Sequence, residues 1–152
     1  MGPFRFRAQP ALELRRREHD AAQRELARAD AERQRARQRL ELAEEAFAEA
    51  QREADTAART EGTGTDHEWY RFWIVRLARE RAARKAELET HDAALAAART
   101  ACLTARQRRE ALERFRDKAF TAHRALEAAV ERRAIDELAT QRHARRDNTE
   151  GA

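Results

Sequence analysis

The stretch RTEGTGTDHE, residues 59–68, decides the fold, because it holds the one strong break in a chain that otherwise favours helix. Gly62 and Gly64 interrupt a helix, since glycine loses more backbone freedom on folding than other residues. Thr65 and Glu68 have the spacing of a capping box, in which the threonine accepts from an exposed backbone N–H and the glutamate reaches back to the cap. The pattern predicts a first helix over about 8–58, a turn over 59–65, a second helix over about 66–140 and a frayed tail over 141–152.

The composition is typical of long helices or a coiled coil rather than of a globule. Charged residues make up 39% of the 152 residues and aromatic residues 6%. The net charge is +4, but acidic and basic residues are interleaved, which indicates a solvated helix surface. The length predicts a single domain over 1–152. One cysteine, Cys102, excludes a disulfide framework within the chain and suits a reducing cytosol.

Both predicted helices carry heptads that alternate bulky side chains with alanine. One seam position of the first helix holds Leu12, His19, Leu26, Arg33, Leu40, Phe47 and Ala54, and the position three residues later holds Arg15, Ala22, Ala29, Ala36, Ala43, Ala50 and Ala57. The second helix offers Ile74, Leu77, Leu88, His91, Leu95, Ala98, Cys102 and Ala105, then, after a phase shift, Leu112, Phe115, Ala119, Ala122 and Leu126. Such sustained heptads predict knobs-into-holes packing of two helices.

Two blocks of charge predict how the helices pair. Residues 41–55 hold six acidic residues and one basic residue, whereas residues 71–85 hold six basic residues and one acidic residue. Each block opposes the dipole of its own helix, so we expect each to compensate the other across the molecule. Folding at the turn places residue i opposite about residue 125 − i, which brings the blocks together and sets Arg33 near Asp92. The sequence therefore predicts an all-α fold, a long antiparallel two-helix coiled-coil hairpin with a longer second helix.

The second helix extends beyond the start of the first in this hairpin. About 20 residues, or about 30 Å of helix, have no intramolecular partner unless Phe4 and Phe6 fold back onto the base of the overhang. The overhang still carries the apolar side chains of Leu126, Val130, Ile135 and Leu138. An unpaired apolar stripe of this kind predicts contact with another protein.

Motifs for catalysis, metal binding and membrane insertion are absent from the sequence. It contains no glycine-rich phosphate loop, no Cys-x-x-Cys, no His-Glu-x-x-His and no helical Glu-x-x-His pair. We therefore expect no enzyme, no cofactor and no metal, with His19, His91 and Cys102 filling the seam. The start MGPFRFRAQPAL lacks the apolar segment of a secretory signal, and no window approaches 18 apolar residues. Nucleic-acid binding is not expected either, since the basic runs 106–110 and 142–146 contain no aromatic residue to stack a base.

The stretch HEWYRFW, residues 67–73, gathers four of the nine aromatic residues directly after the turn. At 100° per residue, Tyr70, Ile74 and Leu77 lie within about 40° of one another and share the seam, while the other rings point away from it. Two interpretations remain open. The rings pack under the loop 59–65, which suits Trp69 best, or they form an exposed patch for a partner.

The two ends of the chain resemble the flagellar export protein family FliJ. The opening FRFRAQPALELRRREHDAAQRELARA is similar to the family's N-terminus, with its Phe-x-Phe pair, a Gln and a charged, Ala-rich helix. The end REALERFRDKAFTAHRALEAAVERRAIDELATQR looks like the family's C-terminus, including an Asp-Glu-hydrophobic-Ala element at residues 136–139. Arg81 and Arg84, two arginines in the seam of the second helix, depart from the pattern.

The resemblance implies a soluble component of the flagellar type III export apparatus, shaped like the central stalk of a rotary ATP synthase. Its implied partners are the hexameric export ATPase FliI, the export gate protein FlhA and the export chaperones. It implies a protein that is monomeric alone and cytoplasmic, associated peripherally with the cytoplasmic face of the inner membrane.

The resemblance also implies two binding regions. The gate would contact the face early in the second helix, formed by Trp69, Tyr70, Phe72, Trp73 and Leu77, with Arg71, Arg76 and Arg79 as a rim. Together with the unpaired stripe, it predicts an ATPase-binding end at Phe4, Phe6, Leu126, Val130, Arg132, Arg133, Ile135 and Leu138. Two alternatives remain: the equivalent stalk of a virulence type III secretion system, the YscO-like group, and an unrelated coiled-coil scaffold that forms homodimers through the overhang.

Overall fold

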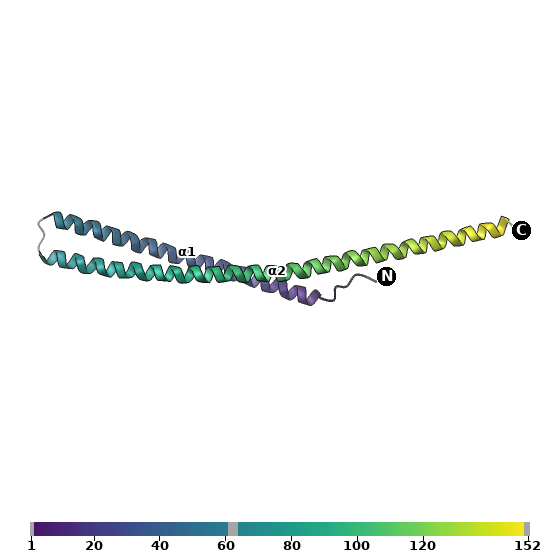
Figure 1. The fold of residues 1–152 in the computed structure, drawn as a ribbon, viewed down its shortest axis with the longest axis horizontal. Coiled ribbons are helices and arrows are strands. Elements are labelled where there is room, and N and C mark those ends of the chain that lie inside the picture. Colours follow the sequence, from purple (N-terminus) through teal and green to yellow (C-terminus); the bar gives the residue numbers. More distant parts are fainter. Residues whose placement is uncertain (1, 61–63, 151–152) are drawn as a thin grey trace. The chain divides into compact units, whose positions relative to one another are not determined.

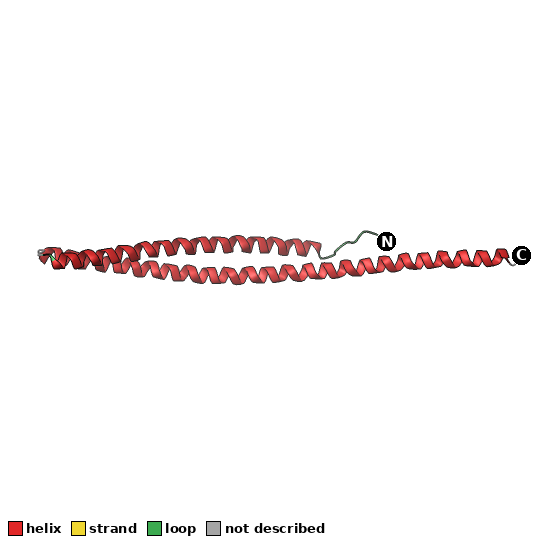
Figure 2. Cartoon of the chain, turned by 90° about the horizontal axis from the view of Figure 1, so that it is seen from above, coloured by secondary structure: helices red, strands yellow, loops and turns green. Residues whose placement is uncertain are grey.

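The computed structural model describes residues 2–60 and 64–150, except for the side chains of residues 65 and 146–150. It contains two helices, α1 (Gln9–Arg59) and α2 (Gly64–Glu150), and the described residues include no strand (Figures 1 and 2). The helices pack against each other and α2 is the longer one. The predicted all-α hairpin with a longer second helix is confirmed.

The helix ends differ from the predicted ones mainly at the C-terminal side. α1 begins and ends within one residue of the prediction, and α2 begins two residues early, at Gly64. α2 continues through the tail that was predicted to fray, as far as Glu150, because no glycine or proline interrupts the chain between residues 65 and 150. The capping hydrogen bonds predicted for Thr65 involve a side chain outside the described residues.

Contacts group the chain into two units, and both helices run through both. The first unit combines residues 1–17 with residues 106–152, and the second comprises residues 18–105. The boundary within α2 falls where its apolar stripe was predicted to change phase, between Ala105 and Leu112. A single coiled-coil domain over 1–152 stays a prediction.

In the unit of residues 18–105, α1 and α2 run antiparallel and side by side (Figures 1 and 2). Arg33 Nε donates to Asp92 Oδ1 at 2.8 Å, which confirms the predicted pair, and Arg39 Nη2 donates to Glu87 Oε1 at 2.6 Å. The buried apolar side chains of this unit are Ala36, Ala43, Ala50, Leu77 and Leu95. Three of the five are alanines of α1, and such small side chains let the partner helix approach closely.

The two charge blocks lie in the facing register, but direct ion pairs do not join them. Within the described residues, no ion pair links an acidic side chain of residues 41–55 to a basic side chain of residues 71–85. The Arg81 guanidinium instead lies 4.2 Å from the centre of the Phe47 ring. Arg84 bonds Glu87, which also accepts from Arg39. Compensation between the blocks, which would act at longer range than a contact pair, stays a prediction.

The unit that contains both termini is held by one fully buried leucine, one ion pair and an aromatic arm. Leu12 is 0% exposed, and the Nε and Nη2 atoms of Arg16 both donate to Glu113 Oε1 at 3.2 Å. The N-terminal arm, residues 2–8, lies on α2 through Phe4 and Phe6. The arm thus covers the base of the overhang, which is the arrangement that the sequence left open.

The seam histidine and the cysteine lie where the heptads place them. His19 is 5% exposed, with Nδ1 3.9 Å from Asp20 Oδ1 in the next position of α1. His91 and Cys102 are half-buried in α2. All three contribute to packing, as the sequence predicts.

Candidate partner-binding surfaces

The aromatic residues at the start of α2 divide between the seam and the surface. Leu77 is 6% exposed and belongs to the core, and Tyr70 and Ile74 are half-buried. Trp69 and Phe72, in contrast, are 58% and 74% exposed. The division follows from the 100° rotation per residue, which turns Tyr70, Ile74 and Leu77 towards α1 and the neighbouring rings away from it.

We define the aromatic patch as Trp69, Phe72, Trp73 and the adjoining Val75, which is 48% exposed. The rings of Trp69 and Trp73 are stacked, with centroids 5.9 Å apart and planes at 12°. Arg76 places its guanidinium 5.6 Å from the centre of the Trp73 ring. Stacking and the cation–π contact orient Trp73 on the surface of α2.

Basic side chains surround the aromatic patch. Arg71, Arg76 and Arg79 are exposed on the same segment of α2. Arginine beside exposed tryptophan is the composition found at the energetically dominant positions of protein interfaces. A partner surface that is apolar at its centre and acidic at its rim would complement the patch.

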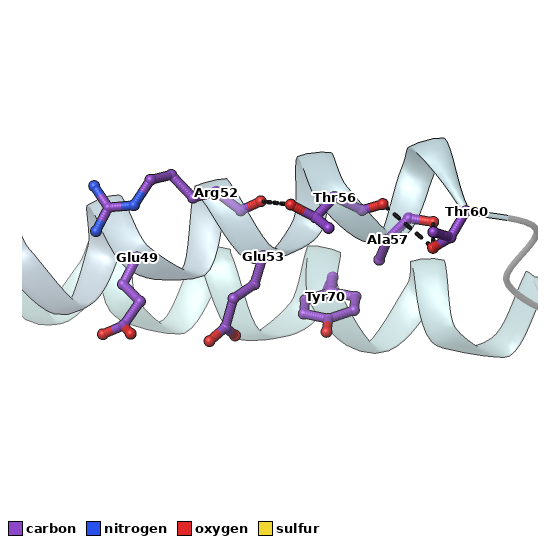
Figure 3. Close-up of a pocket in the computed structure, with 7 residues that line it drawn as sticks. All are labelled: Glu49, Arg52, Glu53, Thr56, Ala57, Thr60 and Tyr70. Carbon is purple, nitrogen blue, oxygen red and sulfur yellow. Dashed lines mark hydrogen bonds between the residues drawn. The ribbon is translucent and has the colours of Figure 1, made fainter.

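Tyr70 lines an open groove between α1 and α2 (Figure 3). The groove is lined by the α1 residues Glu49, Arg52, Glu53, Thr56, Ala57 and Thr60. Glu49 and Glu53 point in the same direction from α1, and Thr56 Oγ1 donates to the Arg52 carbonyl at 2.9 Å (Figure 3). Tyr70 therefore lies between α1 and the aromatic patch, since its ring also packs edge-on against Trp69, with centroids 5.1 Å apart.

The interpretation that the rings pack under the loop 59–65 involves residues 61–63, which lie outside the described part of the chain. Trp69, the ring that suited this interpretation best, is 58% exposed. Of the residues expected to contact the gate, Trp69 and Phe72 are exposed, Trp73 is half-buried beside Trp69, and Leu77 lies in the core.

The second candidate surface is the apolar stripe of α2, which we define as Leu126, Val130, Ile135 and Leu138. These side chains are between 51% and 64% exposed. Leu126 and Val130 are four residues apart and share one face of the helix. Ile135 and Leu138, three apart, share a second face, because nine residues at 100° each turn Ile135 about 180° from Leu126.

Two exposed arginines accompany the apolar stripe. Arg132 turns back along its own helix, with Nε donating to the Ala128 carbonyl at 3.2 Å, and Arg133 follows it. Phe4 and Phe6, which were expected to join the stripe, are half-buried against α2 on its N-terminal side. The stripe itself is thus apolar with a basic flank.

The rings that receive the arm are functional candidates that sequence reasoning missed. Phe4 packs on Phe120 and His123, and Phe6 packs on Phe115. Phe115 is 58% and Phe120 47% exposed even with the arm in place. The signal in the sequence is the spacing of Phe115, Phe120 and His123, which places the three rings on adjacent turns of α2.

Within the described residues, no cluster of three or more His, Cys, Asp or Glu side chains has the geometry to hold a metal ion. No described helix combines the length and the apolar character that crossing a membrane requires.

Residues 4–148, nearly the whole chain, match the family model described as "FliJ: Flagellar FliJ protein". No curated protein and no solved structure matches the chain.

Proposed function

The chain belongs to the FliJ family of flagellar proteins, and from this membership we propose that it links the export ATPase to the export gate. Members of this family are non-catalytic components of the flagellar export apparatus. The single observation that carries the proposal is the match over residues 4–148, which includes both exposed apolar surfaces. In the proposed function each surface serves a different partner.

We assign the aromatic patch to the export gate protein FlhA. Trp69 and Phe72 supply the exposed rings, and Arg76 supplies a basic rim. The half-buried Trp73 stacks on Trp69, while Leu77 holds this segment of α2 against α1. Tyr70 acts with Leu77 as support from within the hairpin. Exposed tryptophan supports this assignment because tryptophan dominates the energetics of protein interfaces.

We assign the apolar stripe to the hexameric ring of the export ATPase FliI. Leu126, Val130, Ile135 and Leu138 supply the apolar contact, and Arg132 and Arg133 supply a basic flank. Phe4 and Phe6 contribute by packing at the base of the stripe. The assignment is supported by the exposure of these four apolar side chains, each of which is more than half exposed.

The remaining elements of the proposal concern location and other partners. The protein is cytoplasmic, associates with the cytoplasmic face of the inner membrane only through the export apparatus, and also binds export chaperones. It is a monomer when alone and binds no nucleic acid. In this role it serves flagellum assembly and motility, without an enzymatic activity or a cofactor of its own.

Co-purification with the cell's own export ATPase tests the proposal. The tagged full chain should retain the ATPase, and the double variant Leu126→Asp, Val130→Asp should lose it, because two charges in an apolar contact are left without partners. The control is Leu42→Asp, which introduces the same charge at a side chain of α1 that is 66% exposed.

Two outcomes would overturn the assignment. One is retention of the ATPase by the double variant at the level of the control. The other is a solution mass twice that of one chain, abolished by the same double variant, since the stripe would then join two copies of the protein.

A further inference from the structure

The arm is attached to α2 by aromatic rings. The Phe4 and Phe120 ring centroids are 5.3 Å apart with planes at 76°, and Phe4 also lies 5.5 Å from the His123 ring. Phe6 lies 5.6 Å from Phe115. These edge-to-face and tilted arrangements are the ones that aromatic pairs prefer.

Little else holds the arm in place. In the described part of the chain, no hydrogen bond or ion pair joins residues 2–8 to α2. The arm has no regular secondary structure before the turn at residues 7–8, and Gln9 N donates to Phe6 O at 3.1 Å where α1 begins. Arg5 and Arg7 are exposed between and beyond the two half-buried rings. Among the described residues, the ring contacts are therefore the interactions that hold the arm on α2.

The arm contacts one end of a longer apolar face. Phe115, Ala119, Ala122, Leu126 and Val130 follow one another at intervals of three or four residues, so they form one continuous face of α2. Phe6 packs on Phe115 and leaves it 58% exposed, and further along the face Leu126 and Val130 are 61% and 51% exposed.

The same region of α2 already packs against a helix on its N-terminal side. Arg16 of α1 bonds Glu113 of α2, and Leu112 is half-buried beside it. Because the face from Phe115 to Val130 continues this helix–helix interface, its natural occupant is another apolar helix. The arm, which is not helical, occupies part of that place.

We propose that the N-terminal arm is a displaceable strap that competes with the ATPase for α2. An apolar helix of the ATPase binds Leu126 and Val130 first and extends onto Phe115 and Phe120 when Phe4 and Phe6 leave. This inference rests on the proposed function, because it takes the export ATPase as the partner of the apolar stripe. Under this inference, Phe4 and Phe6 do not contact the ATPase but are displaced from α2 when the ATPase binds.

Competition between the arm and the ATPase should lower the apparent affinity of the chain for the ATPase. When only molecules with a released strap bind fully, the apparent affinity falls by the fraction of released molecules. The double variant Phe4→Ala, Phe6→Ala removes the rings, so it should bind the purified ATPase about fivefold more tightly than the wild type. The control Arg5→Ala, Arg7→Ala changes exposed residues of the same arm and should bind like the wild type.

A probe on α2 follows the strap directly. With 4-fluorophenylalanine at position 120, the ¹⁹F resonance of the full chain should move on addition of ATPase towards its position in the Phe4→Ala, Phe6→Ala variant. Circular dichroism checks that both arm variants remain as helical as the wild type.

Any of the following outcomes would contradict the strap proposal. If the wild type binds the ATPase and the Phe variant binds equally or more weakly, the rings are part of the contact and only the strap is wrong. The same holds if the fluorine resonance stays in place while the ATPase binds, or if the Arg variant tightens binding as much as the Phe variant. If neither the wild type nor any variant binds the ATPase, the proposed function is wrong, and the strap proposal is wrong with it.

Discussion

Arg33 and Asp92 meet across the hairpin, with Arg33 Nε donating to Asp92 Oδ1 at 2.8 Å. The two residues are 59 positions apart in the chain, so this bond reports the register of the two helices. Both side chains remain partly exposed, at 31% and 49%. A partly exposed pair of this kind sets register more than it adds stability.

A double-mutant cycle should measure the contribution of this pair. We expect a coupling free energy of about 0.2–1 kcal/mol between Arg33→Ala and Asp92→Ala, the usual range for exposed pairs. The charge swap Arg33→Asp, Asp92→Arg should recover part of the stability that either single reversal loses. Thermal denaturation followed by circular dichroism measures all the variants, and a coupling of zero would show that the register is set by packing alone.

Leu12 should be the most sensitive apolar position in the terminal unit. It is 0% exposed, and Leu→Ala changes in cores cost about 2–5 kcal/mol, because the substitution leaves a cavity. Leu14, two residues on and 48% exposed, is the matched control, and Leu14→Ala should change the free energy of unfolding by about 0.5 kcal/mol or less. Chemical denaturation compares the two variants. Equal losses would mean that Leu12 is not packed as described.

Reversal of the acidic block should lower the melting midpoint at low ionic strength. Replacing Glu41, Glu44, Glu45 and Glu49 with Lys places like charges opposite residues 71–85. Because no direct ion pair joins the blocks in the described residues, the loss should shrink in 1 M salt, where the screening length is about 3 Å. Melting curves at low and high salt test this. A fall in melting midpoint of the same size at both salt concentrations would argue against a long-range electrostatic effect.

Glu87 should make the hairpin sensitive to acid. Hydrogen bonds from Arg84 and Arg39 hold the pKa of the Glu87 carboxyl below its ordinary value of 4.5. A carboxyl with a lowered pKa in the folded state stabilises the fold above about pH 4.5, and that contribution disappears as the pH falls through the folded-state pKa.

The variant Glu87→Gln should therefore melt below the wild type at pH 6, and the difference should close as the pH falls towards 3. Melting midpoints of both proteins across this range provide the measurement. A difference that stayed constant with pH would mean that the charge of Glu87 is not what stabilises the hairpin.

Trp73 should be an anchor for the export gate. Trp73→Ala removes the ring that stacks on Trp69 and lies under Arg76, and we expect the gate interaction to weaken by about 2 kcal/mol or more, the usual scale for such an anchor. ATPase binding should persist. A FlhA pull-down measures the change, with Leu14→Ala as the control variant.

Circular dichroism on the same samples separates loss of binding from loss of structure. If Trp73→Ala melts the hairpin and binding falls only in proportion, the aromatic rings stabilise the hairpin and the gate binds elsewhere.

The sequence by itself determined the two helices, their antiparallel pairing and their register. The glycines at 62 and 64 end one helix, and heptads repeated over many turns leave one face of each helix to be covered. The register that brings the charge blocks together also predicted the Arg33–Asp92 bond, because hairpin geometry converts sequence positions into facing pairs. Local repeats with a fixed period were sufficient for these conclusions.

Only the tertiary structure decided which apolar side chains remain uncovered. Periodicity gives the direction of each side chain from its own helix, but coverage depends on what lies opposite. Leu77 and Phe115 both hold predicted seam positions, yet Leu77 is 6% and Phe115 58% exposed. The position of Phe4 on Phe120 and His123 joins residues far apart in sequence through an arm without regular structure. No repeat encodes such a contact, since it follows from how side chains pack in space.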